Sequence, residues 1–200
     1  MRRTAITLLA HALMTIGALT FGALPVEAKA KKNVLPAMRW DAAPRASEWT
    51  QQALLQVAEH DSELTHTVPA DIDVYCPGYA KASKDERRAF WVGLLSATAK
   101  YESGFNQAAV GGKGRYVGLM QISVPTARLY GCDANSSAEL KNGEANLSCA
   151  VDIIAPHVAA DGMVAGKGNR GIARDWGPWS SANNRAAMAA WTRSQTYCQP

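Results

Sequence analysis

The sequence lacks the signals that would assign it to the nucleic-acid-binding, metal-binding or membrane-embedded classes. Its 200 residues carry a formal net charge of only +4, partly from Arg2 and Arg3, which is too weak to indicate a nucleic-acid partner. No pair of cysteines has zinc-finger spacing and the histidines form no ligand pattern, so we expect no metal and no other cofactor. No repeat is present, and no segment after residue 26 is apolar enough to span a membrane.

The composition nevertheless supports a folded protein. Apolar residues make up 48% of the chain and charged residues 19%, which excludes a chain that is disordered throughout. The length allows one or at most two small domains with a buried core.

The amino terminus has the pattern of an export signal. Two arginines precede an uncharged stretch over residues 4–26, and small residues occupy cleavage-type positions at two sites within residues 26–30. A retained membrane anchor is the alternative, because the uncharged stretch is just long enough to span a bilayer. Glycines and a proline in its second half favour cleavage. We predict a signal peptide over residues 1–30, no stable membrane insertion afterwards, and a periplasmic or secreted protein.

Export places the cysteines in an oxidising compartment, where an even number predicts two disulfides. They are Cys76, Cys132, Cys149 and Cys198. Three pairings are possible. The simplest joins Cys132 to Cys149 across a short polar stretch, which leaves Cys76 with Cys198 and ties the carboxy terminus to the start of the domain.

Residues 31–68 are expected to form a leader with one short helix. Residues 31–45 are basic and rich in proline and alanine, which suits a flexible segment, whereas residues 46–64 have apolar residues at helical spacing. We expect this helix to pack on the main domain, which would comprise residues 69–200.

A longer helix is predicted after Ser83. Ser83 and Glu86 match a capping box, in which the serine hydroxyl accepts from an early helix N–H and the glutamate reaches back. The apolar residues that follow recur at three- and four-residue steps as far as Tyr101. This pattern indicates a buried helix that ends near Tyr101.

The rest of the chain also favours helices. Ser123 is a candidate cap with Pro125 in the first turn, and further helices are expected near 144–160 and 181–195. Residues 116–122 are the one fair candidate for a strand. We therefore predict a mainly α fold with at most a small β-hairpin.

Glu102 stands at the expected end of the helix that follows Ser83, beside Tyr101 and near Phe105. Apolar surroundings and the negative end of the helix dipole both raise the pKa of a carboxyl group. A glutamic acid that stays protonated near neutral pH suits a general acid for cleavage of a glycosidic bond. On position alone, a solvated surface residue is the alternative.

Three motifs favour the interpretation of Glu102 as a catalytic acid over that of a surface residue. Residues 101–106 (YESGFN), residues 118–123 (GLMQIS) and Asn146-Leu147 together closely resemble the motifs of the lytic transglycosylase family with the soluble lytic transglycosylase, goose-type-lysozyme-like catalytic domain. The similarity covers roughly residues 85–157. It implies an α+β, lysozyme-like fold and cleavage of the β-1,4 MurNAc–GlcNAc bonds of peptidoglycan, with Glu102 as the catalytic acid and then base.

The acids around Glu102 bear on the mechanism. A typical glycosidase needs two carboxyl groups, yet no Asp or Glu occurs between Glu102 and Asp133. A mechanism with one carboxyl group fits better: Glu102 protonates the leaving oxygen and then deprotonates the MurNAc 6-hydroxyl, which closes to a 1,6-anhydro sugar. If Asp133, Glu139 or Glu144 folds back into the cleft, a hydrolytic muramidase is the alternative.

Supporting roles follow from the same resemblance. It implies that Gln121 and the backbone around Met120 line the groove beside Glu102, although the Met120 side chain suits the core better than a contact with substrate. Ser103 either bonds near Glu102 or finishes the helix. Asn146 is either a ligand of the substrate or a helix cap.

The match to the family is incomplete. The late Ala-Tyr-Asn motif is missing, and residues 174–179 (RDWGPW) stand in its place. Trp176 is expected either to cover Glu102 or stack on a sugar, or else to belong to the core. A glycine-rich loop carries Lys113 and Arg115, which either meet carboxylates of the peptide stem or are solvated.

We therefore expect an exported, monomeric lytic transglycosylase whose partner is the glycan strand of peptidoglycan. A non-catalytic wall-binding or secretion-assembly accessory is the alternative from another class. The sequence leaves open whether the enzyme serves general wall turnover or a cell-envelope secretion apparatus.

Overall fold

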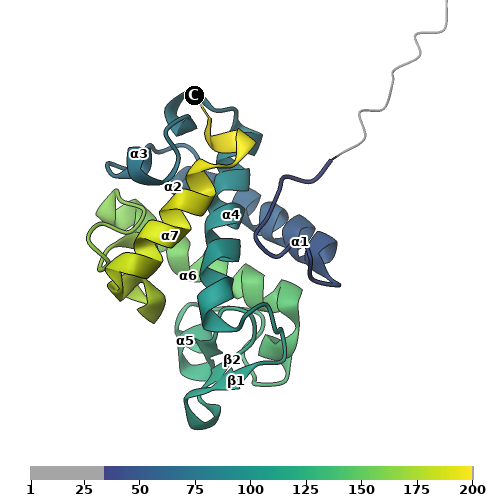
Figure 1. Ribbon diagram of the computed structural model, residues 1–200. Helices are drawn as coiled ribbons and strands as arrows, with labels where there is room; N and C mark the ends of the chain where they lie inside the picture. The colour runs from purple at the N-terminus through teal and green to yellow at the C-terminus, as the bar shows by residue number, and fades with distance from the viewer. Residues whose placement is uncertain (1–33, 200) are drawn as a thin grey trace, which may run out of the picture. The chain divides into compact units, whose positions relative to one another are not determined.

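The computed structural model describes residues 34–199, most of which are helical (Figure 1). The α-helices are α1 (Ala46–Glu59), α2 (Asp61–Leu64), α3 (Ile72–Tyr75), α4 (Lys84–Glu102), α5 (Val124–Leu129), α6 (Gly143–Asp161) and α7 (Ala182–Arg193). Short 3₁₀ helices are Tyr79–Lys81, Gly112–Gly114, Glu139–Lys141, Gly171–Arg174, Gly177–Ser180 and Thr196–Cys198. The strands are β1 (Val110–Gly111), β2 (Tyr116–Val117) and β3 (Ile122–Ser123). The mainly α fold class is confirmed. The signal expected over residues 1–30 lies outside the described residues.

Helix α4 is the central element. Its predicted capping box is present: the Ser83 hydroxyl accepts from the Glu86 N–H at 3.3 Å, and the Glu86 carboxylate accepts from the Ser83 N–H at 2.7 Å. Every residue over 89–99 is buried. A helix that is buried on all sides needs neighbours around it, and α1 and α7 both pack against α4 (Figure 1).

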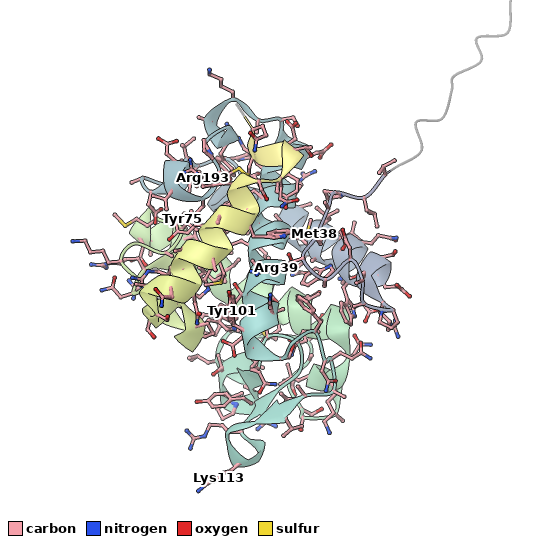
Figure 2. The ribbon with its side chains drawn as sticks, in the orientation of Figure 1. Met38, Arg39, Tyr75, Tyr101, Lys113 and Arg193 are labelled. Atoms are coloured by element: carbon pink, nitrogen blue, oxygen red, sulfur yellow. A yellow bond between two sulfur atoms is a disulfide. The ribbon has the colours of Figure 1, made fainter. Side chains whose placement is uncertain are left out.

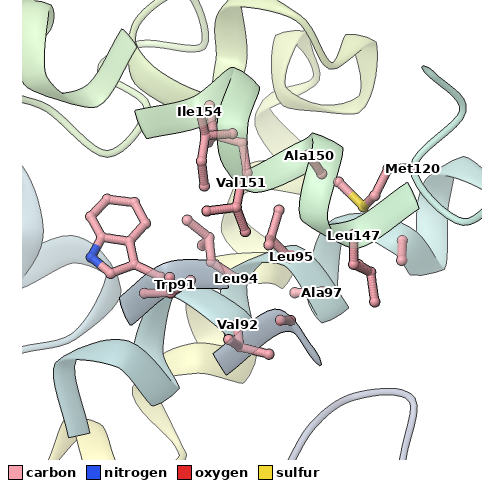
Figure 3. Close-up of a cluster of buried hydrophobic side chains, with 14 of the residues drawn as sticks. Trp91, Val92, Leu94, Leu95, Ala97, Met120, Leu147, Ala150, Val151 and Ile154 are labelled. Carbon is pink, nitrogen blue, oxygen red and sulfur yellow. The ribbon is translucent and has the colours of Figure 1, made fainter. Parts of the chain in front are cut away.

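The core joins α4 to α6. Leu94 and Leu95 of α4 lie in one buried cluster with Leu147 and Val151 of α6, and Met120 lies at its edge (Figure 3). Helix α1 packs along α6 as well as α4, so residues 46–59 contribute to the same core. This agrees with the expectation that the first helix packs on the main domain.

The expectation that residues 31–45 form a flexible leader is wrong for the part that the structure describes near α4. Met38 is 3% exposed and Trp40 is fully buried. The Arg39 N–H donates to the Ser96 hydroxyl of α4 at 3.0 Å. Met38 and Trp40 are large apolar side chains, and their burial fixes this segment.

The small sheet differs from the predicted strand over residues 116–122. It has three antiparallel strands in the order β1-β2-β3, with Val117 opposite both Val110 and Ile122. Residues 118–121 turn the chain between β2 and β3. Gly118 has φ +85° and Gln121 has φ +49°, and two left-handed residues cannot continue a strand.

The remaining helices begin as predicted or close to it. Ser123 caps α5, accepting from the Thr126 N–H at 3.2 Å, with proline in the first turn. Asn142 caps α6 and Ser181 caps α7 through their side-chain oxygens. These local signals therefore place the helices predicted after Ser123 and near 144–160 and 181–195.

Two disulfides close the fold. Cys76 is bonded to Cys198 and Cys132 to Cys149, which is the simplest of the three pairings. The first joins the segment before α4 to the last residues, and the second joins the connection after α5 to α6. None of the helices in residues 34–199 combines the length and apolar character needed to cross a bilayer.

Candidate active site

Glu102 is the last residue of α4, at the end that reaches the small sheet (Figure 1). Burial raises the pKa of its carboxyl from the ordinary value of 4.5 to about 7. No hydrogen bond or charge from the described residues offsets this effect. The apolar environment that the sequence predicted is therefore sufficient to keep much of this carboxyl protonated at neutral pH.

The raised pKa makes the stability of the protein depend on pH. The folded state holds the Glu102 proton more tightly than the unfolded state, so stability falls as the pH rises from 4.5 to about 7. We expect Glu102→Gln, which cannot ionise, to be more stable than the wild type by about 1–3 kcal/mol at pH 8 and equal to it near pH 4. Urea unfolding at both pH values measures this. A constant difference between the two proteins across the range would contradict it.

Ser103 finishes α4. Its N–H donates to the Ala99 carbonyl at 3.0 Å, and its hydroxyl donates to the same carbonyl at 3.4 Å. Of the two roles considered for Ser103, the structure shows the helix-ending one. The chain then turns through Gly104 and Phe105, both at positive φ, toward β1.

Arg39 contacts Tyr101, the residue before Glu102, a contact that sequence reasoning missed. Its guanidinium lies 5.6 Å from the centre of the Tyr101 ring, and both side chains lie along the C-terminal half of α4 (Figure 2). Lys113 projects from the tip of the β1–β2 loop and is exposed, as is Arg115 (Figure 2). No sequence signal links Arg39 to Tyr101, because 62 positions separate them.

The turn between β2 and β3 carries Gln121. The two N–H groups of its side-chain amide donate to the Ala109 and Gly118 carbonyls at 3.2 and 3.0 Å. The amide oxygen therefore remains as the acceptor that Gln121 can offer. A Cβ on Gly118 would come within 2.2 Å of the Asn146 amide and the Leu140 carbonyl, so this turn requires glycine.

Asn146 is not the helix cap, and its side-chain hydrogen bonds are made within the protein. It is fully buried in α6, whose cap is Asn142. Its amide nitrogen donates to the Val117 and Leu140 carbonyls, both at 3.0 Å, and its oxygen accepts from the Met120 N–H at 2.8 Å. The side chain thus uses its hydrogen bonds to hold the turn against α6.

Met120 and Trp176 complete this support. Both are buried, and the Trp176 indole N–H donates to the Met120 carbonyl at 2.8 Å. The Met120 N–H is already bonded to Asn146, so neither the side chain nor the backbone N–H of Met120 is available to a substrate. The structure thus places the Met120 side chain in the core, the alternative that the sequence favoured for it. Trp176, at 4% exposed, is chiefly a core residue with one edge at a pocket.

Removing the indole N–H tests this support. We expect Trp176→Phe to lower the free energy of unfolding by about 1–2 kcal/mol, because the buried Met120 carbonyl loses its donor. Chemical denaturation measures the loss. Trp191→Phe, at a half-buried tryptophan of α7, is the matched control. Equal effects of the two substitutions would show that the hydrogen bond contributes nothing.

A pocket of about 40 Å³ lies beside Gln121. Its lining comes from β2, β3, α5, α6 and the segment before Gly177: Tyr116, Gln121, Ile122, Ser123, Thr126, Ile153, Asp175 and Trp176. Asp175 is a carboxylate that sequence reasoning missed. Its position directly before Trp176, where the family motif is absent, was the available signal.

Asp133, Glu139 and Glu144 were considered as a second carboxyl group for the cleft, and the structure gives them other surroundings. Asp133 and Glu144 line a separate pocket of about 320 Å³ between α1 and α6. Glu139 accepts from the N–H groups of Asn135 and Ser136. Within residues 34–199 no group of three or more His, Cys, Asp or Glu side chains could hold a metal ion.

Residues 80–163 match the family model described as "Transglycosylase SLT domain". The chain carries a transglycosylase SLT domain. The matched range contains all three motifs and both Glu102 and Gln121. This match supports a peptidoglycan-cleaving function of the lytic transglycosylase type.

Solved structures similar to this SLT-domain protein include those of DslA. The wild-type form 2 of DslA is 25% identical with a TM-score of 0.74, and the match covers 83% of this chain and 100% of that chain. Two DslA variants, each with a glutamate replaced by glutamine, are 26% identical with TM-scores of 0.74 and 0.73. Both matches cover 84% of this chain and 100% of that chain. No curated protein matches the sequence significantly.

Proposed function

We propose that the protein is a lytic transglycosylase that cleaves the MurNAc–GlcNAc β-1,4 bond and leaves 1,6-anhydro-MurNAc ends. The observation that supports this most strongly is the Glu102 carboxyl, whose pKa of about 7 leaves both protonation states well populated at neutral pH. The absence of any Asp or Glu between Glu102 and Asp133 favours a mechanism with a single carboxyl group.

In this mechanism Glu102 acts twice. Its protonated carboxyl gives the proton to the glycosidic oxygen as the bond from that oxygen to C1 of MurNAc breaks. The resulting carboxylate then takes the proton of the MurNAc 6-hydroxyl, and O6 bonds to C1. Glu102 returns to its acid form, and no water is consumed.

Gln121 is the supporting residue that this proposal retains as a direct contact. Its amide oxygen is the group left to accept from a sugar hydroxyl or an acetamido N–H. Asn146 and Trp176 act behind it, since both bond to the backbone of Met120. Ser103 ends the helix that carries Glu102.

The products of digestion test the proposal. Purified sacculi are incubated with the protein, and the released muropeptides are separated and weighed by mass spectrometry. Anhydro-muropeptides are the expected products. Reducing ends, heavier by one water molecule, would replace the proposal with hydrolysis, and no release of fragments would replace it with a non-catalytic accessory.

A hydrolytic muramidase is the second candidate, and Asp175 is the observation that favours it. This carboxylate lines the pocket beside Gln121, whereas the sequence placed no second acid there. Hydrolysis through two carboxyl groups would yield the reducing ends described above.

We also propose that the protein acts outside the cytoplasmic membrane, in the periplasm or after secretion, as a monomer on glycan strands. Two disulfides support an oxidising compartment. Fractionation of cells that produce the full chain tests this location. Recovery of the protein in the cytoplasm with free thiols would contradict it.

A further inference from the structure

A carboxylate, that of Asp175, lines the pocket beside Gln121. Asp175 lies between two short 3₁₀ helices, and its side chain is 27% exposed. Gln121 and Trp176 line the same pocket. The carboxylate therefore adjoins the turn that the proposed function places against the glycan.

His157 contacts Asp175, and Tyr130 in turn contacts His157. The Nε2 atom of His157, on α6, lies 2.8 Å from Asp175 Oδ2, and the Tyr130 hydroxyl at the end of α5 lies 2.6 Å from the same nitrogen. The first is a close contact of the carboxylate with the imidazole ring, and the second is a hydrogen bond. The Tyr130 and His157 rings also meet edge to face at 5.7 Å.

Arg174, the residue before Asp175, forms its ion pair with another carboxylate. Arg174 is committed to Asp161, to which its Nε and Nη2 atoms donate at 2.7 and 2.5 Å. Among residues 34–199, His157 is the group that lies within ion-pair distance of the Asp175 carboxylate, and it contacts Oδ2. The other carboxylate oxygen, Oδ1, is left to accept from a ligand.

The polar groups that Gln121 and Asp175 offer are thus both acceptors. The N–H groups of the Gln121 amide are bonded to backbone carbonyls, and a carboxylate has no donor. A pocket of about 40 Å³ holds one substituent and not a whole sugar ring. The group that complements these two acceptors is therefore a single hydroxyl or amide N–H.

We propose that Asp175 is a further substrate-binding residue, accepting a hydrogen bond from a hydroxyl or amide N–H of the bound glycan. His157 and Tyr130 are positioning residues that act through Asp175. This inference rests on the proposed function, because it takes the groove beside Gln121 to be the site of the glycan.

Binding to insoluble sacculi tests the contact without turnover. In a Glu102→Gln background, Asp175→Ala is expected to weaken co-sedimentation affinity by about 10- to 100-fold, the effect of losing a hydrogen bond to a charged group. Asp175→Asn keeps an acceptor and is expected to fall in between. Asp133→Ala, in the separate pocket between α1 and α6, is the matched control and should bind like its parent.

Thermal unfolding of each variant identifies any that fails to fold, and Asp175→Asn decides the result if Asp175→Ala does not fold. Affinities of Asp175→Ala, or of Asp175→Asn in that case, that equal the parent's would overturn the assignment.

The positioning role of His157 requires a different readout. In steady-state digestion, His157→Phe is expected to raise KM by about 3- to 10-fold with kcat changed less than twofold. In the Asp175→Ala background the same substitution should leave KM unchanged, because the two residues act as a unit. A full additional rise in KM there would show that His157 does not act through Asp175.

The two proposals fail separately. If the wild type releases anhydro-muropeptides but the Asp175 variants bind sacculi as tightly as their parent, the assignment of Asp175 is wrong and the proposed function stands. If binding depends on Asp175 but the wild type releases no fragments, the proposed function is wrong and the contact stands.

Discussion

Replacing Glu102 with glutamine is expected to lower the rate of glycan cleavage by about 10²- to 10⁴-fold. Glutamine matches glutamate in size and still forms hydrogen bonds, but it can neither give a proton to the leaving oxygen nor take one from the 6-hydroxyl. Because Glu102 has no ionic partner among the described residues, the substitution leaves no charge unpaired. The loss of rate therefore reports on proton transfer and not on folding.

The measurement is the release of soluble muropeptides from sacculi by equal amounts of each protein. Glu59→Gln is the matched control, since Glu59 is also the last residue of a helix, α1, but is exposed. We expect this control to release fragments at the wild-type rate. Undiminished release by Glu102→Gln would remove Glu102 from the mechanism.

Removing the Cys76–Cys198 disulfide is expected to lower the free energy of unfolding by about 5 kcal/mol, which is a large part of the stability of a domain of this size. The bond links residues 122 positions apart, so its loss frees a long loop in the unfolded chain. The Cys132–Cys149 bond spans only 17 positions, and its removal should lower stability by about 3 kcal/mol.

Paired alanine variants compare the two bonds without leaving free thiols. Cys76→Ala with Cys198→Ala is set against Cys132→Ala with Cys149→Ala, and both are followed by chemical denaturation. The reverse order of stabilities would contradict the loop-length argument. It would show that native contacts around the shorter bridge matter more.

Most of the helices could be predicted because their signals are local in the sequence. The Ser83–Glu86 capping box and the caps at Ser123 and Ser181 lie within three or four residues of the groups they bond. Such signals are complete within a short window of sequence, so the helices could be predicted. The raised pKa of Glu102 could be predicted for the same reason, because a helix end and its apolar neighbours are adjacent in the chain.

The support of the site could not be predicted in this way. Asn146 reaches Met120 across 26 positions and Trp176 reaches it across 56. Asp175 joins the Gln121 pocket only because two distant segments pack together. Single residues give no pattern for such contacts, so the bonds from Asn146 to the turn were not predicted and Asp175 was missed.

The burial of Met38 and Trp40 was not predicted for a similar reason. A stretch rich in proline and alanine is typical of a linker, and two large apolar side chains do not change its average composition. What fixes the segment is its contact with α4, 57 positions away at the bond from Arg39 to Ser96.

The hydrogen bonds around the β2–β3 turn have a consequence for the thermodynamics of recognition. Side chains from α6 and from the segment before Gly177 hold both the N–H and the carbonyl of Met120, next to Gln121. The conformational entropy of this turn is therefore lost when the protein folds and not again when a ligand arrives. A rigid acceptor presented in this way favours ligands by preorganisation, so Asn146 and Trp176 influence affinity through the free state of the protein.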